Sequence, residues 1–190
     1  VHDQETDETT RVSISSSANQ GNENSSGSSI SAEGRYVAFT SRASNLVDSD
    51  TNSCEDVFVY DRQTMETTRV STSSLGSQGN EASDIGSSNR SISSDGRYIT
   101  FTSYANNLII NDTNNQPDVF VFDRQLNETT RVSVSSSGDQ GNNGSLFPSI
   151  SADGRYVAFY SSASNLVLGD TNGKSDIFVH DRLTSETKRV

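Results

Sequence analysis

The sequence predicts an all-β protein built of β-propeller blades, with three antiparallel repeats of four strands each. The first observation is self-similarity: a Gly-Arg-Tyr triplet begins at Gly34, Gly96 and Gly154, which places the repeats 62 and 58 residues apart. The second is that every repeat carries four strand-like runs, while helical periodicity is absent. We expect the three repeats to be part of a larger propeller of about six to eight blades, or of one that an oligomer completes.

The first predicted strand of each repeat is short and ends at a tight hairpin. It covers Ser29–Ser31 in the first repeat, with copies at 91–93 and 149–151. An acidic residue and a glycine follow each time, as in Asp95-Gly96, and this pair favours a hairpin turn that needs positive φ. A β-solenoid is the alternative architecture. Because the coils of a solenoid do not require a hairpin after every first strand, the propeller is favoured.

The other three strands of each repeat differ in their apolar patterning. The second and third strands are continuous apolar runs, as expected of strands that are buried on both faces. They lie at 36–39, 98–101, 156–159, 57–60, 119–122 and 177–180. The fourth strand begins at Thr67 in the first repeat and alternates polar and apolar residues, which suits an outer, half-exposed strand. The four extra residues of the second repeat fall between Asn80 and Gly96, where we expect a loop.

These strands divide the chain into four segments. We expect the outer strand of a preceding blade at 1–14 and the blade repeats at 15–72, 73–134 and 135–190. Both ends hold the same outer strand, because Val1-His2-Asp3 returns as Val179-His180-Asp181. We therefore expect an open segment: an excerpt of a longer array, half of a ring of about six blades that a second copy completes, or part of a filament of blades.

Composition and charge restrict the class of partner. The net charge is −11 and the 14 Lys and Arg residues are scattered, whereas nucleic-acid binding needs clustered basic side chains, so we expect no nucleic-acid partner. No apolar stretch approaches the roughly 18 residues of a transmembrane helix, so we expect no membrane span. Only 30% of the residues are hydrophobic, but they gather in strand-length runs, which argues against disorder.

One stretch of the third repeat resembles a known family. It reads Ser-Ile-Ser-Ala-Asp-Gly-Arg-Tyr-Val-Ala-Phe from Ser149 to Phe159, and Asp-Ile-Phe-Val-His-Asp follows from Asp176 to Asp181. This pattern resembles the TolB-like propeller repeat of bacterial proteins, and the resemblance extends over all three repeats. It implies the propeller fold. It leaves the function open, because such blades occur in protein-docking modules, in gating domains of peptidases and in uncharacterised secreted proteins.

The sequence Asp-Thr-Asn-x-x-x-Asp, once in each repeat, is the strongest candidate for a metal site. Its oxygen ligands fall at positions one, three and seven of a short loop, which is how a calcium loop begins. The candidate ligands are Asp50, Asn52, Asp56, Asp112, Asn114, Asp118, Asp170, Asn172 and Asp176. The bidentate Glu of a calcium loop does not follow. The alternative is an Asx-turn in which the last Asp fixes the start of the third strand through backbone hydrogen bonds.

Other polar residues are expected to be structural. The pair Asp61-Arg62 recurs in every repeat, and with Arg69 on the next strand it is expected to form ion pairs between strands. No catalytic residue is predicted, because His2 and His180 occupy equivalent positions and neither has a third partner for a catalytic triad. Sequences for N-glycosylation begin at Asn24, Asn89, Asn111, Asn127 and Asn143.

These observations favour a non-catalytic function. We expect an extracellular, cell-surface or periplasmic propeller scaffold that binds a protein or glycan ligand, or further copies of the same repeat. Calcium is the only cofactor that the sequence suggests. Two alternatives stay open: a structural, filament-forming repeat protein of an extracellular assembly, and a regulatory propeller of a larger enzyme.

Overall fold

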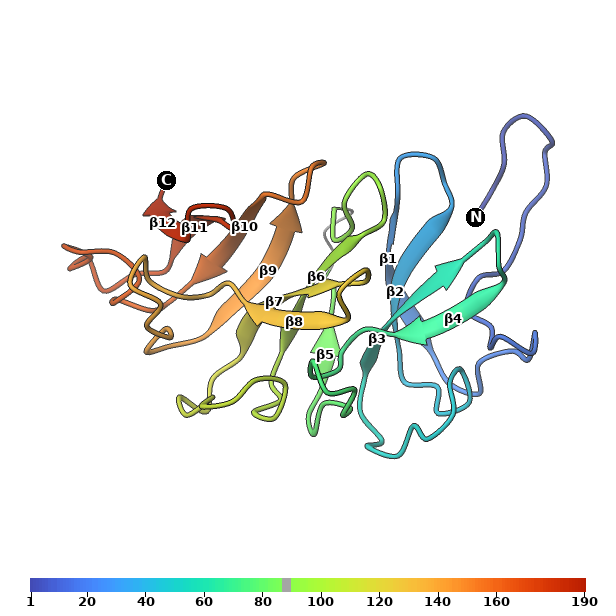
Figure 1. Cartoon of the computed structure of the whole chain (residues 1–190), viewed down its shortest axis with the longest axis horizontal. Helices are drawn as coiled ribbons and strands as arrows, with labels where there is room; N and C mark the ends of the chain where they lie inside the picture. The colour runs from blue at the N-terminus through green and yellow to red at the C-terminus, as the bar shows by residue number, and fades with distance from the viewer. Residues whose placement is uncertain (87–89) are drawn as a thin grey trace.

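The computed structural model describes residues 1–86 and 90–190, so the candidate glycosylation sequence at Asn89 begins outside the described residues. Within the described part, the chain forms twelve strands that pair as three four-stranded antiparallel sheets. The same residues contain no helix that could cross a membrane. Figure 1 shows the three sheets side by side in chain order, with the two termini at opposite ends of the row. The predicted all-β fold of three four-stranded blades is confirmed.

We call the three sheets blades 1, 2 and 3. Blade 1 consists of β1 (Ser25–Ile30), β2 (Tyr36–Ser41), β3 (Asp56–Asp61) and β4 (Glu66–Arg69). Blade 2 consists of β5 (Ser83–Asp84), β6 (Tyr98–Ser103), β7 (Asp118–Asp123) and β8 (Glu128–Arg131). Blade 3 consists of β9 (Ser145–Ile150), β10 (Tyr156–Ser161), β11 (Asp176–Asp181) and β12 (Glu186–Arg189). Each strand pairs with the next one along the chain, so every blade is a meander.

The second and third strands of each blade match the prediction and run slightly further. β2 and β3 pair without a break from Tyr36↔Asp61 to Ser41↔Asp56, and the other blades repeat this register. All six residues of β3 are buried. One phenylalanine from each strand meets its neighbour across the pair, with the ring centroids of Phe39 and Phe58 5.8 Å apart. These two strands therefore form the apolar centre of the blade.

The first strand begins earlier than predicted. β1 starts at Ser25, whose hydroxyl donates to Ser41 Oγ at 3.0 Å, so strand pairing begins in a serine-rich stretch without apolar pattern. It ends at Ile30, because Ser31 already belongs to the turn: its hydroxyl accepts a hydrogen bond from the amide of Tyr36 at 3.0 Å. The predicted hairpin follows at Gly34, where φ is 70°. The bounds 29–31 and their copies were therefore wrong, while the turn is confirmed.

Blade 2 has an interrupted first strand. β5 covers only Ser83–Asp84, and the next described pairing of this strand is the isolated bridge Ile92↔Ile99. The four extra residues of the second repeat fall between these two pairings. The insertion therefore lies between two pairings of the inner strand, and its residues 87–89 lie outside the described residues.

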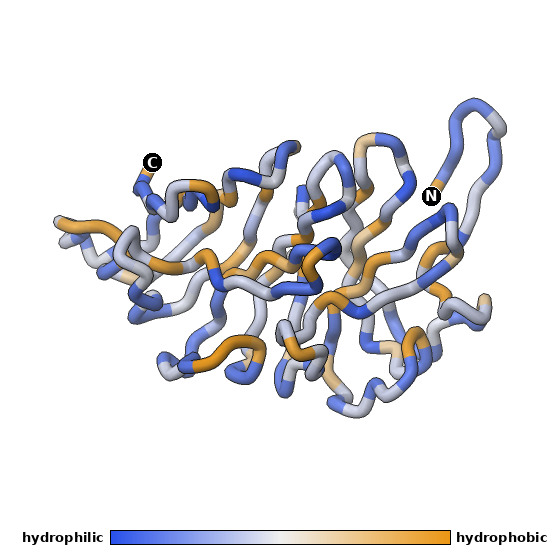
Figure 2. The backbone as a smooth tube through the Cα atoms, in the orientation of Figure 1, coloured by the Kyte–Doolittle hydropathy of each residue, from blue (hydrophilic) through white to orange (hydrophobic). Residues whose placement is uncertain are grey.

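The hydrophobic core lies between the blades. Val57 and Val59 on one face of blade 1 pack with Phe101 and Phe120 of blade 2, and all four are buried. The interface of blades 2 and 3 repeats this arrangement. Figure 2 shows hydrophobic stretches along the strands between neighbouring sheets. We call the face of a blade toward the next blade in sequence its downstream face, and the opposite one its upstream face.

A short hairpin precedes blade 1. In this N-terminal hairpin (residues 1–11), His2 and Thr9 form one bridge, which is the pairing that His180 and Thr187 make in β11 and β12. Val12 follows it and packs with Phe39 and other residues on the upstream face of blade 1. The first residues thus lie where the outer hairpin of a further blade would lie.

Candidate functional site

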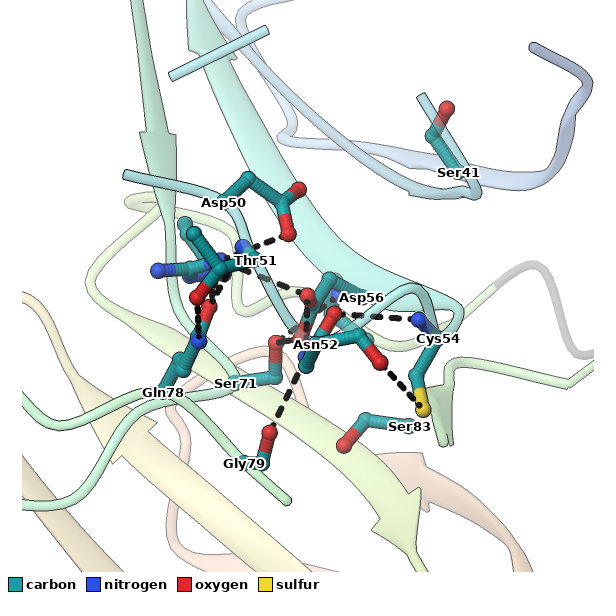
Figure 3. Close-up of polar contacts among 12 residues, drawn as sticks. Ser41, Asp50, Thr51, Asn52, Cys54, Asp56, Ser71, Gln78, Gly79 and Ser83 are labelled. Carbon is teal, nitrogen blue, oxygen red and sulfur yellow. Dashed lines mark hydrogen bonds and ion pairs between the residues drawn. The ribbon is translucent and has the colours of Figure 1, made fainter. Parts of the chain in front are cut away.

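The predicted metal-site residues of each repeat meet around an arginine side chain. In blade 1, Asp50 Oδ1 and Asp56 Oδ2 lie 3.2 and 3.4 Å from Nη1 of Arg69. Asn52 donates from Nδ2 to Asp56 Oδ2 at 2.9 Å. Figure 3 shows Asp50, Asn52 and Asp56 close to one another, with Ser71, which follows β4 in the chain, next to Asp56. A guanidinium group therefore contacts both carboxylates of the cluster.

The other two blades contain the same cluster. Its Nη1–Oδ1 and Nη1–Oδ2 distances are 3.3 and 3.0 Å for Arg131 with Asp112 and Asp118, and 2.9 and 3.4 Å for Arg189 with Asp170 and Asp176. The clusters differ in burial. The side chain of Arg131 is 9% exposed, whereas that of Arg189 is 35% exposed. Among the described residues, no further blade packs against the cluster of blade 3.

The loops contain the hydrogen bonds of an Asx-turn, which was the alternative to a metal site. In each blade the asparagine Oδ1 accepts a hydrogen bond from the amide two residues later, at 3.0 Å from Cys54 in blade 1. Asp56 fixes the start of β3 indirectly: the hydroxyl of Ser71 donates to its Oδ1 at 2.5 Å and accepts from the amide of Val57 at 3.1 Å. The serine that links Asp56 to β3 was not foreseen.

The electrostatics of the cluster favour a cation. Burial raises the pKa of Asp50 above its ordinary value, the charge of Asp56 raises it further, and Arg69 opposes both. Among the described residues, no three His, Cys, Asp or Glu side chains are arranged to hold a metal ion. Calcium takes about six to eight oxygen ligands. Calcium binding at these loops stays a prediction, and it requires the arginine to leave.

The Asp-Arg sequences form ion pairs with other partners than predicted. Asp61 is held by two hydrogen bonds from Arg35, at 2.9 Å from Nε and 2.7 Å from Nη2, and not by Arg62 or Arg69. These bonds lower the pKa of Asp61 to about 2. Arg62 instead donates from Nη1 to the carbonyl oxygen of Gly34 at 2.8 Å. Both arginines stabilise the blade, so the expectation of a structural role agrees with these contacts.

The two histidines make equivalent contacts. Nδ1 of His180 lies 2.9 Å from Oγ1 of Thr187, and Nδ1 of His2 lies 3.0 Å from Oγ1 of Thr9. Burial lowers the pKa of His180 below its ordinary value, which favours the neutral imidazole. The contact of His180 pins the third strand of the blade to the fourth, and the hydroxyl of Thr187 donates to the carbonyl oxygen of Val134 at 2.6 Å.

A tyrosine contact links each blade to the next, and sequence reasoning missed it. Tyr36 of blade 1 lies so close to Gly96 of blade 2 that a Cβ there would be 2.0 Å from its ring. The guanidinium carbon of Arg124 lies 4.1 Å from the centroid of the same ring. Blades 2 and 3 repeat the contact through Tyr98 and Gly154. Its signal in the sequence was the recurring Gly-Arg-Tyr triplet. The glycine of the triplet contacts the preceding blade, and the tyrosine contacts the next one.

The two end blades expose the faces that are buried elsewhere. On the downstream face of blade 3, Ile177 is 46% exposed, whereas Val119 at the same position of blade 2 is fully buried. Phe147 is 62% exposed on this face and contacts Tyr160, with the ring centroids 6.3 Å apart. On the upstream face of blade 1, Ile30 is 47% exposed. These two faces are the apolar surfaces that the row leaves uncovered.

A cavity separates the N-terminal hairpin from blade 1. Its volume is about 550 Å³, and its lining includes Val1, Val12, Ile30 and Val37. It lies where the inner strands of a preceding blade would pack. The upstream face of blade 1 is therefore only partly covered.

Comparison with known proteins supports the fold and not a particular activity. No family model and no curated protein matches the sequence. The structure resembles TolB from Acinetobacter baumannii, with 17% identity and a TM-score of 0.54 over 90% of this chain and 32% of that one. Putative TolB from Agrobacterium tumefaciens gives the same identity and TM-score over 87% and 48%. The β-propeller domain of the Trilobed protease from Pyrococcus furiosus gives 13% and 0.52 over 88% and 42%.

This chain spans between about a third and a half of the length of those three proteins. At such identities the likeness shows the fold alone. The three sheets are TolB-like β-propeller blades, as the resemblance in the sequence implied.

Proposed function

We propose that this segment of a TolB-like β-propeller is a non-catalytic scaffold, placed outside the cell, on its surface or in the periplasm, that binds a protein or a glycan. One observation carries the proposal. The polar residues that recur in every blade pair with one another within the chain, whereas Phe147, Tyr156 and Ile177 are exposed together on the downstream face of blade 3. An apolar face of this kind on a soluble protein is typical of a binding surface.

The polar clusters support a non-catalytic function. The charge of Arg69 is balanced by the two carboxylates that it contacts, Asp50 and Asp56. The same cluster recurs in every blade, so it does not mark one particular site. His180 is bonded to a threonine and has no acidic partner that could orient it as a base. Chemistry in a repeat protein needs residues that break the repeat. The departures on blade 3 include Phe147, which is apolar, and His180, whose ring contacts a threonine.

A filament of blades is the alternative that the structure favours next. Among the described residues, the downstream face of blade 3 is uncovered and the upstream face of blade 1 is partly covered. They are different faces, so head-to-tail contacts between chains would extend the row. A regulatory propeller of a larger enzyme has one supporting observation, the likeness to the propeller domain of the Trilobed protease.

Two measurements on the full chain test the proposed function. Fluorogenic peptide, ester and glycoside substrates report catalysis, while an array of defined glycans and sedimentation velocity report binding. We expect no turnover above that of heat-denatured protein, together with a saturable complex that Ile177→Thr weakens. Leu168→Ser, at a fully exposed loop residue of the same blade, is the matched control and is expected to bind as the parent does. Turnover that persists through repurification, or a chain that binds neither glycan nor protein, would contradict the proposal.

A further inference from the structure

The two uncovered faces carry the two halves of one contact. We propose that the downstream face of blade 3 binds the upstream face of blade 1 of a second copy of this chain, head to tail. This inference rests on the binding function proposed above and names the partner of that face.

The tyrosine contact supplies the first argument. Within the chain it is made twice, each time by a tyrosine on the downstream face and by a glycine and an arginine on the upstream face of the next blade. At the ends each half lacks its complement. Tyr156 is 40% exposed and stacks only with its own neighbour Arg155, at 4.8 Å. A Cβ at Gly34 would meet no ring, because its nearest atoms are Nη1 of Arg62 at 3.4 Å and Cδ1 of Ile30 at 3.8 Å.

The arginine of the uncovered half is already in place. Arg62 donates to the carbonyl oxygen of Gly34 at 2.8 Å, as Arg124 does to Gly96 at 3.0 Å beneath the ring of Tyr36. The site for a tyrosine on blade 1 is thus preorganised, which removes part of the entropic cost of binding.

The backbone supplies a second, directional argument. The amide of Ala32 donates to the carbonyl oxygen of Ser94 at 3.1 Å, and the amide of Ser94 donates to that of Ala152 at 2.9 Å. This ladder crosses from blade 1 to blade 3 in one direction. Its next step would run from the amide of Ala152 to the carbonyl oxygen of Ala32 in a second copy. A donor at one end and an acceptor at the other specify a head-to-tail contact instead of a symmetric one.

The shapes of the two faces agree where they depart from the repeat. Phe147 stands where blade 1 has Gly27, and it contacts Tyr160, so this part of blade 3 is enlarged. The opposing part of blade 1 has a cavity of about 230 Å³, which lies between the serine- and glycine-rich start of β1 and the side chains of Phe39 and Val12. The enlarged part of blade 3 would thus meet a partly apolar hollow, and such complementarity is what a close interface requires.

The N-terminal hairpin must withdraw for the two copies to meet. It lies where the outer hairpin of the docking blade would lie, because residues 1–12 correspond to 179–190. β11 and β12 pair at four positions, whereas the N-terminal hairpin has one bridge, His2↔Thr9, and is mostly exposed. The hairpin competes with a second copy for the upstream face and therefore limits the affinity between copies.

Disulfide trapping tests the geometry on the full chain. The variant carries Ala32→Cys and Ala152→Cys in a Cys54→Gln background, since Gln116 holds the equivalent position in blade 2. Under mild oxidation we expect either a linked dimer or a ladder of longer linked chains on a non-reducing gel, with position 32 joined to position 152 in peptide mass spectra in both cases. The single variants Ala32→Cys and Ala152→Cys are the controls and stop at dimers. Only 32–32 and 152–152 links in the double variant would overturn the proposal.

Sedimentation velocity of chains without engineered cysteines measures the strength of the contact. We expect Tyr156→Ser to weaken self-association by at least about tenfold, because it removes an aromatic anchor, and Leu168→Ser to leave it unchanged. At concentrations where the parent is monomeric, the melting temperature of Tyr156→Ser should stay that of the parent, since Tyr156 is 40% exposed. Thr9→Gly, which removes the partner of His2, is expected to strengthen association.

The outcomes separate this inference from the proposed function. A closed dimer and longer chains both support it. A monomer at every concentration that binds a glycan overturns the head-to-tail contact and leaves the scaffold function standing. A monomer that binds nothing overturns both.

Discussion

Blades 2 and 3 have nearly the same residues in the same register and differ in what covers them. Val119 of blade 2 is fully buried, while Ile177 at the same position of blade 3 is 46% exposed. The side chain of Asp118 is 0% exposed and that of its counterpart Asp176 is 22% exposed. The second, third and fourth strands of the two sheets pair alike, so the difference at these positions comes from the neighbour and not from the strands themselves.

This comparison shows that a blade is an incomplete folding unit. A repeat protein gains its stability from each repeat and from the interfaces between neighbours. Blade 2 has both interfaces and blade 3 has one, so equal substitutions in the two blades should have unequal effects. The predictions below use matched pairs of substitutions to test that statement.

Removing the arginine of the acidic cluster should have the largest effect. Arg131→Met leaves Asp112 and Asp118 buried without their counterion, so we expect a loss of about 3 kcal/mol in the free energy of unfolding. In blade 3 water reaches Arg189 and Asp176, although Asp170 is only 3% exposed, so the loss for Arg189→Met should be smaller, about 1–2 kcal/mol. Urea denaturation measures both values. Equal losses would show that the neighbouring blade does not set the burial of the cluster.

Glycine substitutions should have the next largest effect. Gly96 and Gly34 have φ of 72° and 70°, so replacement by alanine adds similar backbone strain at both. At Gly96 the new Cβ would also overlap the ring of Tyr36, whereas at Gly34 it meets nothing closer than 3.4 Å. We expect Gly96→Ala to destabilise the chain by about 1–3 kcal/mol more than Gly34→Ala. Thermal unfolding of the two variants measures the difference, and equal melting temperatures would count against the tyrosine contact.

The loss of unfolding free energy in acid should be similar in blades with and without a covering neighbour. Hydrogen bonds from Arg35 depress the pKa of Asp61 to about 2 from an ordinary 3.8, and those from Arg155 depress the pKa of Asp181 as well. Between the folded and unfolded values the unfolded chain binds more protons, so this stabilisation is present above about pH 4 and is lost as the pH falls toward 2. Arg35→Gln and Arg155→Gln should flatten the acid slope of the unfolding free energy to a similar extent. A steep slope that neither variant changes would contradict this.

Calcium should give the smallest effect, and it should distinguish the blades. The cation can enter a cluster only if the arginine leaves, and Arg189 is the most exposed of the three arginines. We therefore expect calorimetry with millimolar calcium to show at most one weak site, which Asp170→Asn removes. Three equal sites that Asp170→Asn leaves in place would show that the arginine does not block calcium.

The sequence was sufficient for the repeat, the strand number and the two middle strands, because apolar runs and Asp-Gly turns are local signals. The first strand was misplaced, since Ser25 pairs through its backbone and hydroxyl and carries no apolar pattern. The insertion in blade 2 was located, but its position between two pairings of the inner strand depends on contacts with β6 that no local pattern reveals.

The sequence predicted the Asp and Asn residues of the candidate site but not the arginine that lies between them. The spacing of Asp50, Asn52 and Asp56 showed that these residues meet. That Arg69 lies between them depends on the register of β3 and β4, in which it is paired with Phe58. The tyrosine contact joins separate repeats, and its members lie 60 residues apart, as Tyr36 and Gly96 do. Residues so distant in sequence are brought together only by the packing of one blade on the next.

Hydrogen–deuterium exchange of β7 and β11, followed at rising protein concentration, tests the central claim most directly, because the two strands have the same pairing and different cover. At low concentration the amides of β11 should exchange faster than those of β7, since among the described residues no blade covers the downstream face of blade 3, which opens at lower cost. At high concentration the exchange of β11 should slow toward that of β7 as a second copy covers Ile177 and Tyr156. Equal exchange of the two strands at every concentration would contradict the account.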